Sequence, residues 1–383
     1  MALYLDCNAT TPVDPAVVAA MEPYWSQQFG NPSSSHRVGR SAKNGLDRAR
    51  QQVAELAGAS SHRQVIFTGS GTEANHLALL GMAASFEQPG TVAIGATEHA
   101  SLFGAAAMLQ AQGWQLMELP VDALGQLQLH AMDVDQLQAI DLLSVMVANN
   151  ETGVLQDLEK LAWLRRESGA KLHIDATQAG GKIPLNFSAL EVDCMTLSAH
   201  KLYGPKGVGA LIVDSALKLY PQLQGGGQER GIRSGTENIP AIVGFGAAAE
   251  LAQQTLEARA AQQLKCRQLL EQGLMQMSGV EIVAQQARRL PNTVMCLVDG
   301  IEGETLLMQL DQQGIALSSG SACQVGKTAP NKVLTAMGIT PEAAKGAIRI
   351  SLCRNVTETE IEHFLQVLRG ILMPSEALWG AVG

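Results

Sequence analysis

The chain has 383 residues, a formal net charge of −9, 46% hydrophobic residues and 16% charged residues. This balance predicts a folded protein of about two or three domains and excludes a disordered one. The acidic charge and the 4% aromatic content argue against nucleic acid as a direct partner. Residues 1–6 lack the basic and long apolar regions of a signal peptide, and no apolar run reaches the roughly 20 residues of a membrane span. We therefore expect a cytoplasmic protein with no membrane partner.

Apolar runs alternate with helical patterns over the first 250 residues. This alternation indicates a largely parallel sheet covered by helices. In such a sheet, ligand sites lie at the carboxyl ends of the strands. The predicted strands are 65–67, 92–94, 142–147, 172–174, 194–197 and 208–213, and the predicted helices are 36–57, 70–85, 99–112 and 157–168.

The pattern changes in the last third of the chain. Residues 237–277 form one long or broken helical stretch that is rich in Ala, Gln and Leu. Residues 357–360 have the sequence of a capping box and should open a last helix. Between them, strands are predicted at 280–284, 293–298 and 347–352 and helices near 303–312 and 330–337. These elements indicate a smaller α+β domain.

Six cysteines are present, but none has the spacing of a zinc site or a C-x-x-C motif, so no metal site is predicted. Most are expected to be reduced thiols that serve as small hydrophobic residues. This interpretation fits those among apolar neighbours, namely Cys194, Cys266, Cys296 and Cys353. Cys323 differs, because it ends the small, polar run 318–323 and is expected to be exposed.

Lys201 follows the predicted strand 194–197 in a loop flanked by glycine. It could be an ordinary solvated lysine, bind phosphate, or form a Schiff base with a carbonyl group. The Walker pattern for nucleotide phosphates is absent from the chain. This absence weakens a nucleotide-binding interpretation and leaves the Schiff base open.

A Schiff-base lysine that holds pyridoxal phosphate requires further groups at the same edge of the sheet. Asp175, at a strand end, could hold the proton of the pyridinium nitrogen, and Gln178 or residues 149–151 could reach the ring oxygen. Residues 68–73 form a glycine-rich turn before a helix, which suits a phosphate. His99 begins a helix, where it could stack on the ring or simply bond the helix start. Each signal is modest, but together they describe one cofactor.

The same residues belong to a series of ordered motifs at 5–12, 29–34, 98–99, 149–153, 173–178, 198–201, 225–236 and 318–323. With these motifs the chain resembles the cysteine desulfurases of the NifS/IscS-like branch, which are pyridoxal-phosphate enzymes in the class V aminotransferase group. The resemblance runs from Leu5 to about Leu368. It implies an α/β, aspartate-aminotransferase-like fold of type I. The large domain, 14–255, would carry a mostly parallel seven-stranded sheet, and residues 1–13 and 256–383 would form the small α+β domain with a mobile Cys323 loop.

The resemblance also implies a role for each polar residue. Lys201 carries the cofactor, Asp175 contacts the pyridinium nitrogen, and Cys323 is the nucleophile. His99 stacks on the ring and could donate a proton. The other implied contacts are to the ring oxygen from Gln178 and Asn150, to the phosphate from Gly71, Thr72, Ser198, His200 and the neighbouring subunit's Thr236, and to the substrate from Arg349, Asn8 and Asn150.

The implied reaction converts L-cysteine to L-alanine and leaves the sulfur on Cys323 as a persulfide. The implied partners are a second copy of the chain with shared active sites and a sulfur-acceptor protein. The acceptor would serve iron–sulfur cluster assembly, or the modification of tRNA or a thio-cofactor. The alternatives are a selenocysteine lyase, another pyridoxal-phosphate β-lyase, or a non-catalytic sulfur-assembly partner. The last of these predicts the loss of Lys201, Asp175 or Cys323, and all three are present.

Two departures from the family pattern affect the sulfur-transfer step. The usual Cys-Thr-Ser or Cys-Thr-Thr is Cys323-Gln324-Val325 here, and Lys327 replaces a smaller residue. The tail at 373–383 is shorter than the tail with which housekeeping members dock the iron–sulfur scaffold. The preferred acceptor is therefore left open by the sequence.

Overall fold

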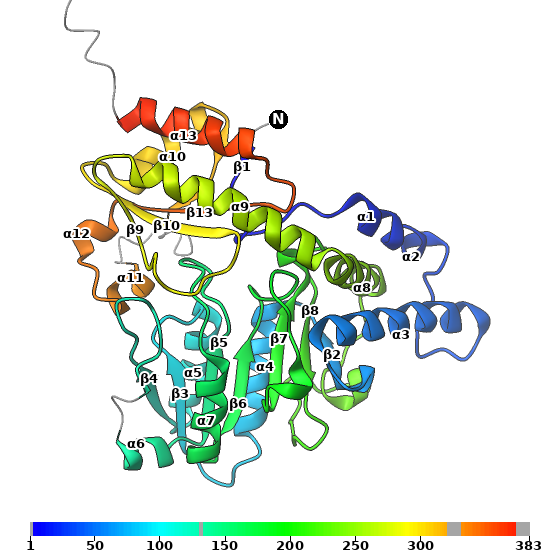
Figure 1. The fold of residues 1–383 in the computed structure, drawn as a ribbon. Coiled ribbons are helices and arrows are strands. Elements are labelled where there is room, and N and C mark those ends of the chain that lie inside the picture. The colour runs from blue at the N-terminus through cyan, green and yellow to red at the C-terminus, as the bar shows by residue number, and fades with distance from the viewer. Residues whose placement is uncertain (1–2, 130–132, 320–330, 373–383) are drawn as a thin grey trace, which may run out of the picture.

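The computed structural model describes residues 3–129, 133–319 and 331–372 (Figure 1). A large α/β body carries a smaller group of strands and helices above it, and helices α1 (Pro15–Met21), α2 (Pro23–Ser26) and α3 (Arg37–Ala57) extend to one side. Within the described ranges, no helix combines the length and apolar character that crossing a membrane requires.

The large body is built on a seven-stranded sheet of order β2-β8-β7-β6-β5-β3-β4. Only β8 runs antiparallel to its neighbours, so the predicted mostly parallel sheet is confirmed. The edge strand β4 was not among the predicted strands, because its residues are largely exposed and lack an apolar run. The strands are β2 (Val65–Thr68), β3 (Thr91–Gly95), β4 (Gln115–Leu119), β5 (Leu142–Met146), β6 (Lys171–Asp175), β7 (Cys194–Ser198) and β8 (Gly209–Val213).

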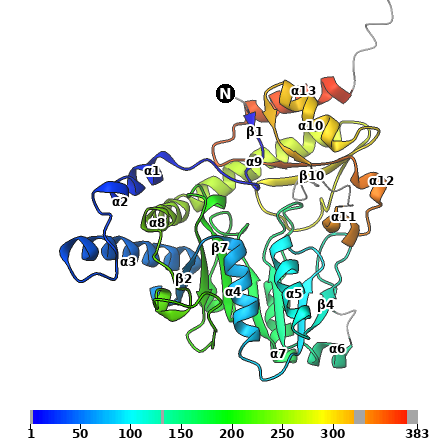
Figure 2. The same ribbon diagram turned by 180° about the vertical axis from the view of Figure 1, so that it is seen from behind.

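Helices cover both faces of this sheet. On one face, α4 (Gly71–Ala83) and α5 (Ala100–Ala111) share a core with the strands (Figure 2). On the other face, α3, α7 (Leu158–Ser168) and α8 (Ile239–Gln254) pack in a second core. Helix α6 (Val134–Gln138) lies beside α7. Both strand faces are therefore buried, which is why the strands read as continuous apolar runs.

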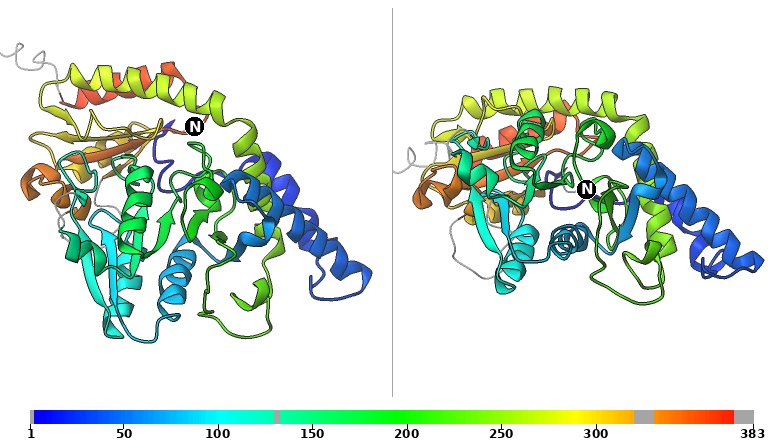
Figure 3. Two further views of the ribbon diagram at one scale, coloured as in Figure 1. Left: turned by 60° about the horizontal axis from the view of Figure 1, so that its bottom comes forward. Right: turned by 90° about the horizontal axis from the view of Figure 1, so that it is seen from below.

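The predicted long or broken helix is broken at Thr255, between α8 and α9 (Leu256–Met275). Figure 3 shows α9 running along the outer side of the smaller group. There, an antiparallel sheet of order β12-β13-β10-β9 shares a third core with α9, α10 and α13. Two further strands, β1 and β11, pair in parallel beside it. The bounds are β1 (Leu3–Tyr4), β9 (Val280–Ile282), β10 (Thr293–Val298), α10 (Gly303–Gln312), β11 (Ile315–Ala316), β12 (Ser318–Ser319), α11 (Lys332–Ala336), α12 (Pro341–Ala344), β13 (Ala347–Ser351) and α13 (Glu358–Leu372).

The capping box before α13 forms as predicted. The backbone N–H of Thr357 donates to Glu360 Oε2 at 2.8 Å, and the N–H of Glu360 donates to Thr357 Oγ1 at 3.2 Å. These two bonds satisfy donors that the first turn of a helix would otherwise leave without partners.

One cysteine prediction is wrong. Cys353 is joined to Cys7 by a disulfide bond, with the two Cα atoms 5.4 Å apart, whereas Cys194, Cys266 and Cys296 are buried free thiols as expected. The backbone brings the pair together, because Cys7 N–H donates to the carbonyl of Ser351 and Ser351 N–H donates to that of Leu5. The 346-residue separation of the two cysteines hides this contact from the sequence pattern.

Candidate active site

A cavity of about 490 Å³ lies where the carboxyl ends of the parallel strands meet the N-terminal segment and β13. It collects the predicted site residues from seven separate segments of the chain. These residues are Asn8, Gly71, Thr72, His99, Asn150, Asp175, Gln178, Ser198, His200, Lys201 and Arg349. Their convergence follows from the topology, because parallel strands end at one edge of the sheet.

Lys201 ends η4 (Ala199–Lys201), a single 3-10 turn that directly follows β7. Its Nζ donates to the backbone carbonyl of Asn8 at 2.6 Å and to that of Ala9 at 2.8 Å. The amine is therefore held against the N-terminal segment while it lines the cavity.

Asp175 is the last residue of β6, and both of its oxygens accept hydrogen bonds. Oδ1 accepts from the N–H of Thr177 at 2.9 Å, and Oδ2 accepts from Asn75 Nδ2 at 2.8 Å. These bonds orient the carboxylate within the cavity wall. Asn75 is 1% exposed on α4 and also donates to Ser101 Oγ, and sequence reasoning missed it. Its signal was a polar residue within an otherwise apolar helical pattern, one turn after the glycine-rich turn.

His99 is the N-cap residue of α5, so its expected helix-start role is present in the structure. Its Nδ1 accepts from the N–H of Ser101 at 3.2 Å and lies 2.8 Å from Ser101 Oγ. The ring also lines the cavity. Burial lowers the pKa of His99, the charge of Asp175 opposes this shift, and Lys201 adds to it.

The start of α4 leaves space for an anion. The N-cap Ser70 accepts from the N–H of Glu73, and the helix begins at Gly71. A Cβ atom at Gly71 would lie 3.2 Å from Ser198 Cβ and 3.3 Å from Thr177 Oγ1, so a side chain would crowd this corner. Backbone N–H groups at a helix start, together with nearby hydroxyls, favour a phosphate.

His200 lies at the same end of the cavity and makes a side-chain contact of 3.1 Å between Nδ1 and Thr10 Oγ1. Burial, with the nearby positive charges of Lys201, Lys206 and Lys182, lowers the pKa of His200 to about 4. The imidazole is therefore neutral at neutral pH and acts as a hydrogen-bonding group rather than a cation.

Arg349 enters the cavity from β13 and is 4% exposed. Its Nη2 pairs with Asp6 Oδ1 at 2.8 Å, and its Nη1 donates to the carbonyl of Asn150 at 3.2 Å. The Nε atom is buried without a hydrogen-bond partner among the described residues. Asp6, which sequence reasoning did not single out, thus orients a guanidinium group that keeps a donor for a further acceptor.

Of the two remaining predicted residues, one does not line this cavity and the other is not described by the structure. Thr236 is exposed, follows η5 (Glu229–Gly231), and does not line the cavity of its own chain. Its loop is tied to α4 by Arg233, whose Nε donates to Glu73 Oε1 at 2.7 Å. Cys323 lies outside the described residues, whereas Ser318, in the strand that precedes it, lines the cavity.

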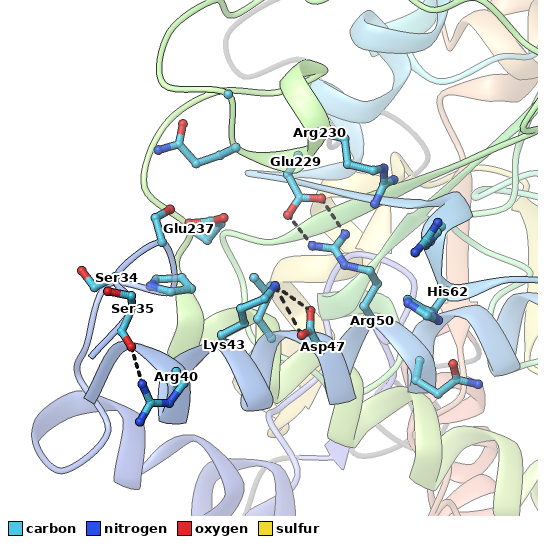
Figure 4. A pocket seen from close by; sticks show the side chains of 17 residues that line it. Ser34, Ser35, Arg40, Lys43, Asp47, Arg50, His62, Glu229, Arg230 and Glu237 are labelled. Atoms are coloured by element: carbon cyan, nitrogen blue, oxygen red, sulfur yellow. Dashed lines mark hydrogen bonds and ion pairs between the residues drawn. The ribbon is translucent and has the colours of Figure 1, made fainter. Parts of the chain in front are cut away.

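Figure 4 shows another cavity, of about 790 Å³, between α3 and the loop that carries η5. Its buried charges are paired with each other, since Arg50 Nη1 lies 2.6 Å from Glu229 Oε2. Glu229 also accepts from the N–H of Phe67 at 2.9 Å. The ion pair therefore holds the loop against α3, and the bond from Phe67 holds it against β2.

Comparison with known proteins agrees with this architecture. The family model described as aminotransferase class-V matches residues 3–364. The cysteine desulfurase of Gluconacetobacter diazotrophicus is 41% identical over 97% of this chain and 93% of its own length. The cysteine desulfurase of Rhodobacter capsulatus is also 41% identical, over 97% of this chain and 96% of its own.

Solved structures show the same fold. A NifS-like protein superposes with a TM-score of 0.90 at 36% identity, covering 98% of this chain and 100% of its own. A structure described as SspA in complex with cysteine has a TM-score of 0.79 at 29% identity, covering 91% and 98%. The chain therefore belongs to the class-V aminotransferase family. Within that family it falls among the cysteine desulfurases and NifS-like proteins, so the predicted resemblance and fold class are confirmed.

Proposed function

We propose that the protein is a cysteine desulfurase that uses pyridoxal phosphate to convert L-cysteine to L-alanine and transfers the sulfur to Cys323. The observation that carries this proposal is the meeting of Lys201, Asp175 and Arg349 in one cavity. Relatives that are 41% identical over nearly the full length and are named cysteine desulfurase support it.

The cavity offers what pyridoxal phosphate needs. It contains a lysine amine for covalent attachment, an oriented carboxylate, an imidazole ring, and a helix start where a Cβ atom would crowd Ser198 and Thr177. When bound, the cofactor supplies a ring that accepts electrons from the substrate Cα. The residues that would hold it are Lys201, Asp175, Gln178, Asn150, His99, Gly71, Thr72, Ser198 and His200.

Lys201 and Arg349 have different roles in the proposed reaction. Lys201 would hold the cofactor, and its amine would move a proton from the substrate Cα. Arg349 binds the substrate carboxylate, for which a guanidinium fork is well suited, and Asn8 and Asn150 lie at the same end. Asp6 already occupies one Nη atom of Arg349 and so fixes the direction in which the remaining donors point.

Cys323 takes up the sulfur. Its thiolate attacks the sulfur of the substrate, a new sulfur–sulfur bond forms, and the bond between sulfur and Cβ breaks. The electrons of the broken bond stay with the carbon fragment, which takes up protons and leaves as L-alanine. His99 is positioned in the cavity to donate one of them. The sulfur atom remains on Cys323 as a persulfide.

The partners and domains form part of the same proposal. A second copy of the chain donates Thr236 to the phosphate, and an acceptor protein in the cytoplasm removes the sulfur from Cys323. The separate core shared by α9, α13 and the antiparallel sheet supports a small domain at 1–13 and 256–383 beside the large domain at 14–255.

The proposal is tested with purified protein loaded with pyridoxal phosphate. Wild-type protein should show visible cofactor absorption, form alanine from L-cysteine and, without reductant, gain one sulfur atom on the peptide that contains Cys323. Cys323→Ser should bind the cofactor and make almost no alanine. Cys296→Ser is the matched control, because burial raises the pKa of Cys296 to about 12 and leaves almost no thiolate at neutral pH.

Three outcomes would contradict the proposal. The first is a wild-type protein that cannot be loaded with pyridoxal phosphate. The second is turnover by Cys323→Ser, and the third is sulfur that maps to a different cysteine.

A further inference from the structure

Lys182 contacts two cavity residues but does not itself line the cavity. It follows the turn after β6 and is 8% exposed, which is rare for a lysine. Its Nζ donates to Gln178 Oε1 at 2.6 Å and to Asn8 Oδ1 at 2.8 Å. Among the residues that the structure describes, no carboxylate forms a salt bridge with Lys182. The amine therefore interacts with two amide oxygens rather than with a counter-ion.

The amide nitrogens of Gln178 and Asn8 also form hydrogen bonds. Gln178 Nε2 donates to the backbone carbonyl of Asn8 at 2.9 Å, and Asn8 Nδ2 donates to the carbonyl of Asn150 at 3.1 Å. A backbone carbonyl can only accept, so these contacts require NH2 groups at those ends. The amide oxygens must then face Lys182. The network permits one orientation of each amide.

The surroundings of Lys182 disfavour a positive charge on its amine. Burial, with the positive charges of Lys201, Arg349 and Arg259, holds the pKa of Lys182 well below its usual range. Among the described residues, the amine donates its hydrogen bonds to the two amide oxygens.

The orientation of Gln178 matters to the cavity. Its NH2 group has two hydrogens, of which one is donated to the carbonyl of Asn8. The second remains for a group inside the cavity, which Gln178 lines. The same carbonyl of Asn8 accepts from Lys201 Nζ at 2.6 Å. Lys182 therefore contacts Gln178 directly and is linked to Lys201 through Asn8.

We propose that Lys182 is a positioning residue that holds the amide oxygen of Gln178, so that Gln178 presents an N–H donor to the ring oxygen of the cofactor. This inference rests on the proposed function, because it requires pyridoxal phosphate in the cavity. A donor to the ring oxygen stabilises negative charge there, so its loss should raise the pH at which the cofactor absorption changes.

The test compares the pH midpoint of that absorption change in four variants. Lys182→Met and Gln178→Leu should each raise the midpoint, on the order of one pH unit. The double variant should match Gln178→Leu alone, because Lys182 acts through that amide. Lys182→Gln keeps an N–H donor at the end of its side chain and should lie nearer to wild type.

Lys171→Met is the matched control. Lys171 is the first residue of β6, at the end of the strand opposite to Asp175, and it donates to Ser85 Oγ. Its variant should keep the wild-type midpoint. The equilibrium constant for cofactor binding to the apo-protein gives a second readout that does not depend on turnover, and Lys182→Met should weaken it as Gln178→Leu does.

The outcomes separate this inference from the function on which it rests. A wild-type protein that does not bind the cofactor contradicts the proposed function. An active wild type with an unshifted Lys182→Met midpoint, or with additive effects in the double variant, overturns only the role of Lys182. If Lys182→Met does not fold, the pH midpoint of Lys182→Gln is the deciding measurement. If neither variant folds, the amine of Lys182 serves folding alone and the proposal is overturned.

Discussion

Arg349 shows how a single residue combines a structural and a ligand-binding task. On sequence alone, a structural salt bridge is the better interpretation of an arginine in an apolar strand, and only the family resemblance implies a substrate contact. In the structure Arg349 pairs with Asp6 and also lines the cavity, and its buried Nε has no hydrogen-bond partner among the described residues. Because Arg349 is almost fully buried, removing its guanidinium group should greatly weaken the binding of a substrate carboxylate.

We expect Arg349→Gln to raise the KM for L-cysteine by about thirtyfold or more, equivalent to ~2 kcal/mol, with little change in cofactor absorption. Steady-state kinetics and absorption spectra check this. Arg354→Gln is the control, since Arg354 is paired with Asp14 outside the cavity. An unchanged KM in Arg349→Gln would place the substrate carboxylate elsewhere.

At the scale of elements, the central strands are joined by side chains as well as by backbone hydrogen bonds. His173 on β6 lies 2.8 Å from Ser144 Oγ on β5 and 2.9 Å from Thr196 Oγ1 on β7. Burial lowers the pKa of His173 from 6.5 to about 4, and the charge of Asp175 opposes this shift. The folded sheet therefore holds a neutral imidazole that the unfolded chain would protonate below about pH 6.5.

Because the pKa of His173 is lower in the folded state, its contribution to stability is present above pH 6.5 and is lost as the pH falls toward 4. Between pH 7.5 and pH 5, we expect His173 to account for about 2 kcal/mol of lost unfolding free energy. Denaturant unfolding at the two pH values should show a smaller loss in His173→Asn than in wild type. Equal losses would show that His173 is protonated in the folded protein.

At the scale of the whole molecule, the position of Thr236 favours a shared site. Its loop is fixed to the large body by Arg50 with Glu229 and by Arg233 with Glu73, yet Thr236 itself is exposed and outside its own cavity. A rigid loop with an exposed hydroxyl is suited to reach a second copy of the chain.

Mixed dimers test this arrangement. One subunit carries Thr236→Ala and the other Lys201→Ala, so a shared-site dimer has one site with both groups and one with neither. Such heterodimers should recover about half of the wild-type activity, as expected for two equivalent sites. Verified heterodimers with no activity above that of the two parent variants would show that Thr236 serves its own chain.

The disulfide bond also acts at this scale, because it joins the two ends of the described chain at Cys7 and Cys353. After denaturation, alkylation with and without prior reduction should differ by two labelled cysteines, which peptide mapping assigns to Cys7 and Cys353. Cys7→Ser should remove the difference. Equal labelling with and without reduction would show that Cys7 and Cys353 are reduced thiols, as the sequence predicted.

Much of the fold could be predicted because its signals are local. Apolar runs, helical periodicity and the capping box at Thr357 each depend on a few neighbouring residues. The edge strand β4 was missed because only one of its residues is buried. Most of the site was also predictable, since parallel strands bring the residues at their carboxyl ends to one edge without any knowledge of packing.

By itself, the sequence determined the class of fold, the cavity edge and most of the residues that line it. Only the tertiary structure decided the contacts that orient them: Asn75 on Asp175, Asp6 on Arg349 and Lys182 on Gln178. Asn75 and Asp175 are 100 residues apart, and the paired cysteines 346. Such contacts leave no periodic trace in the chain, because they depend on how distant segments pack together.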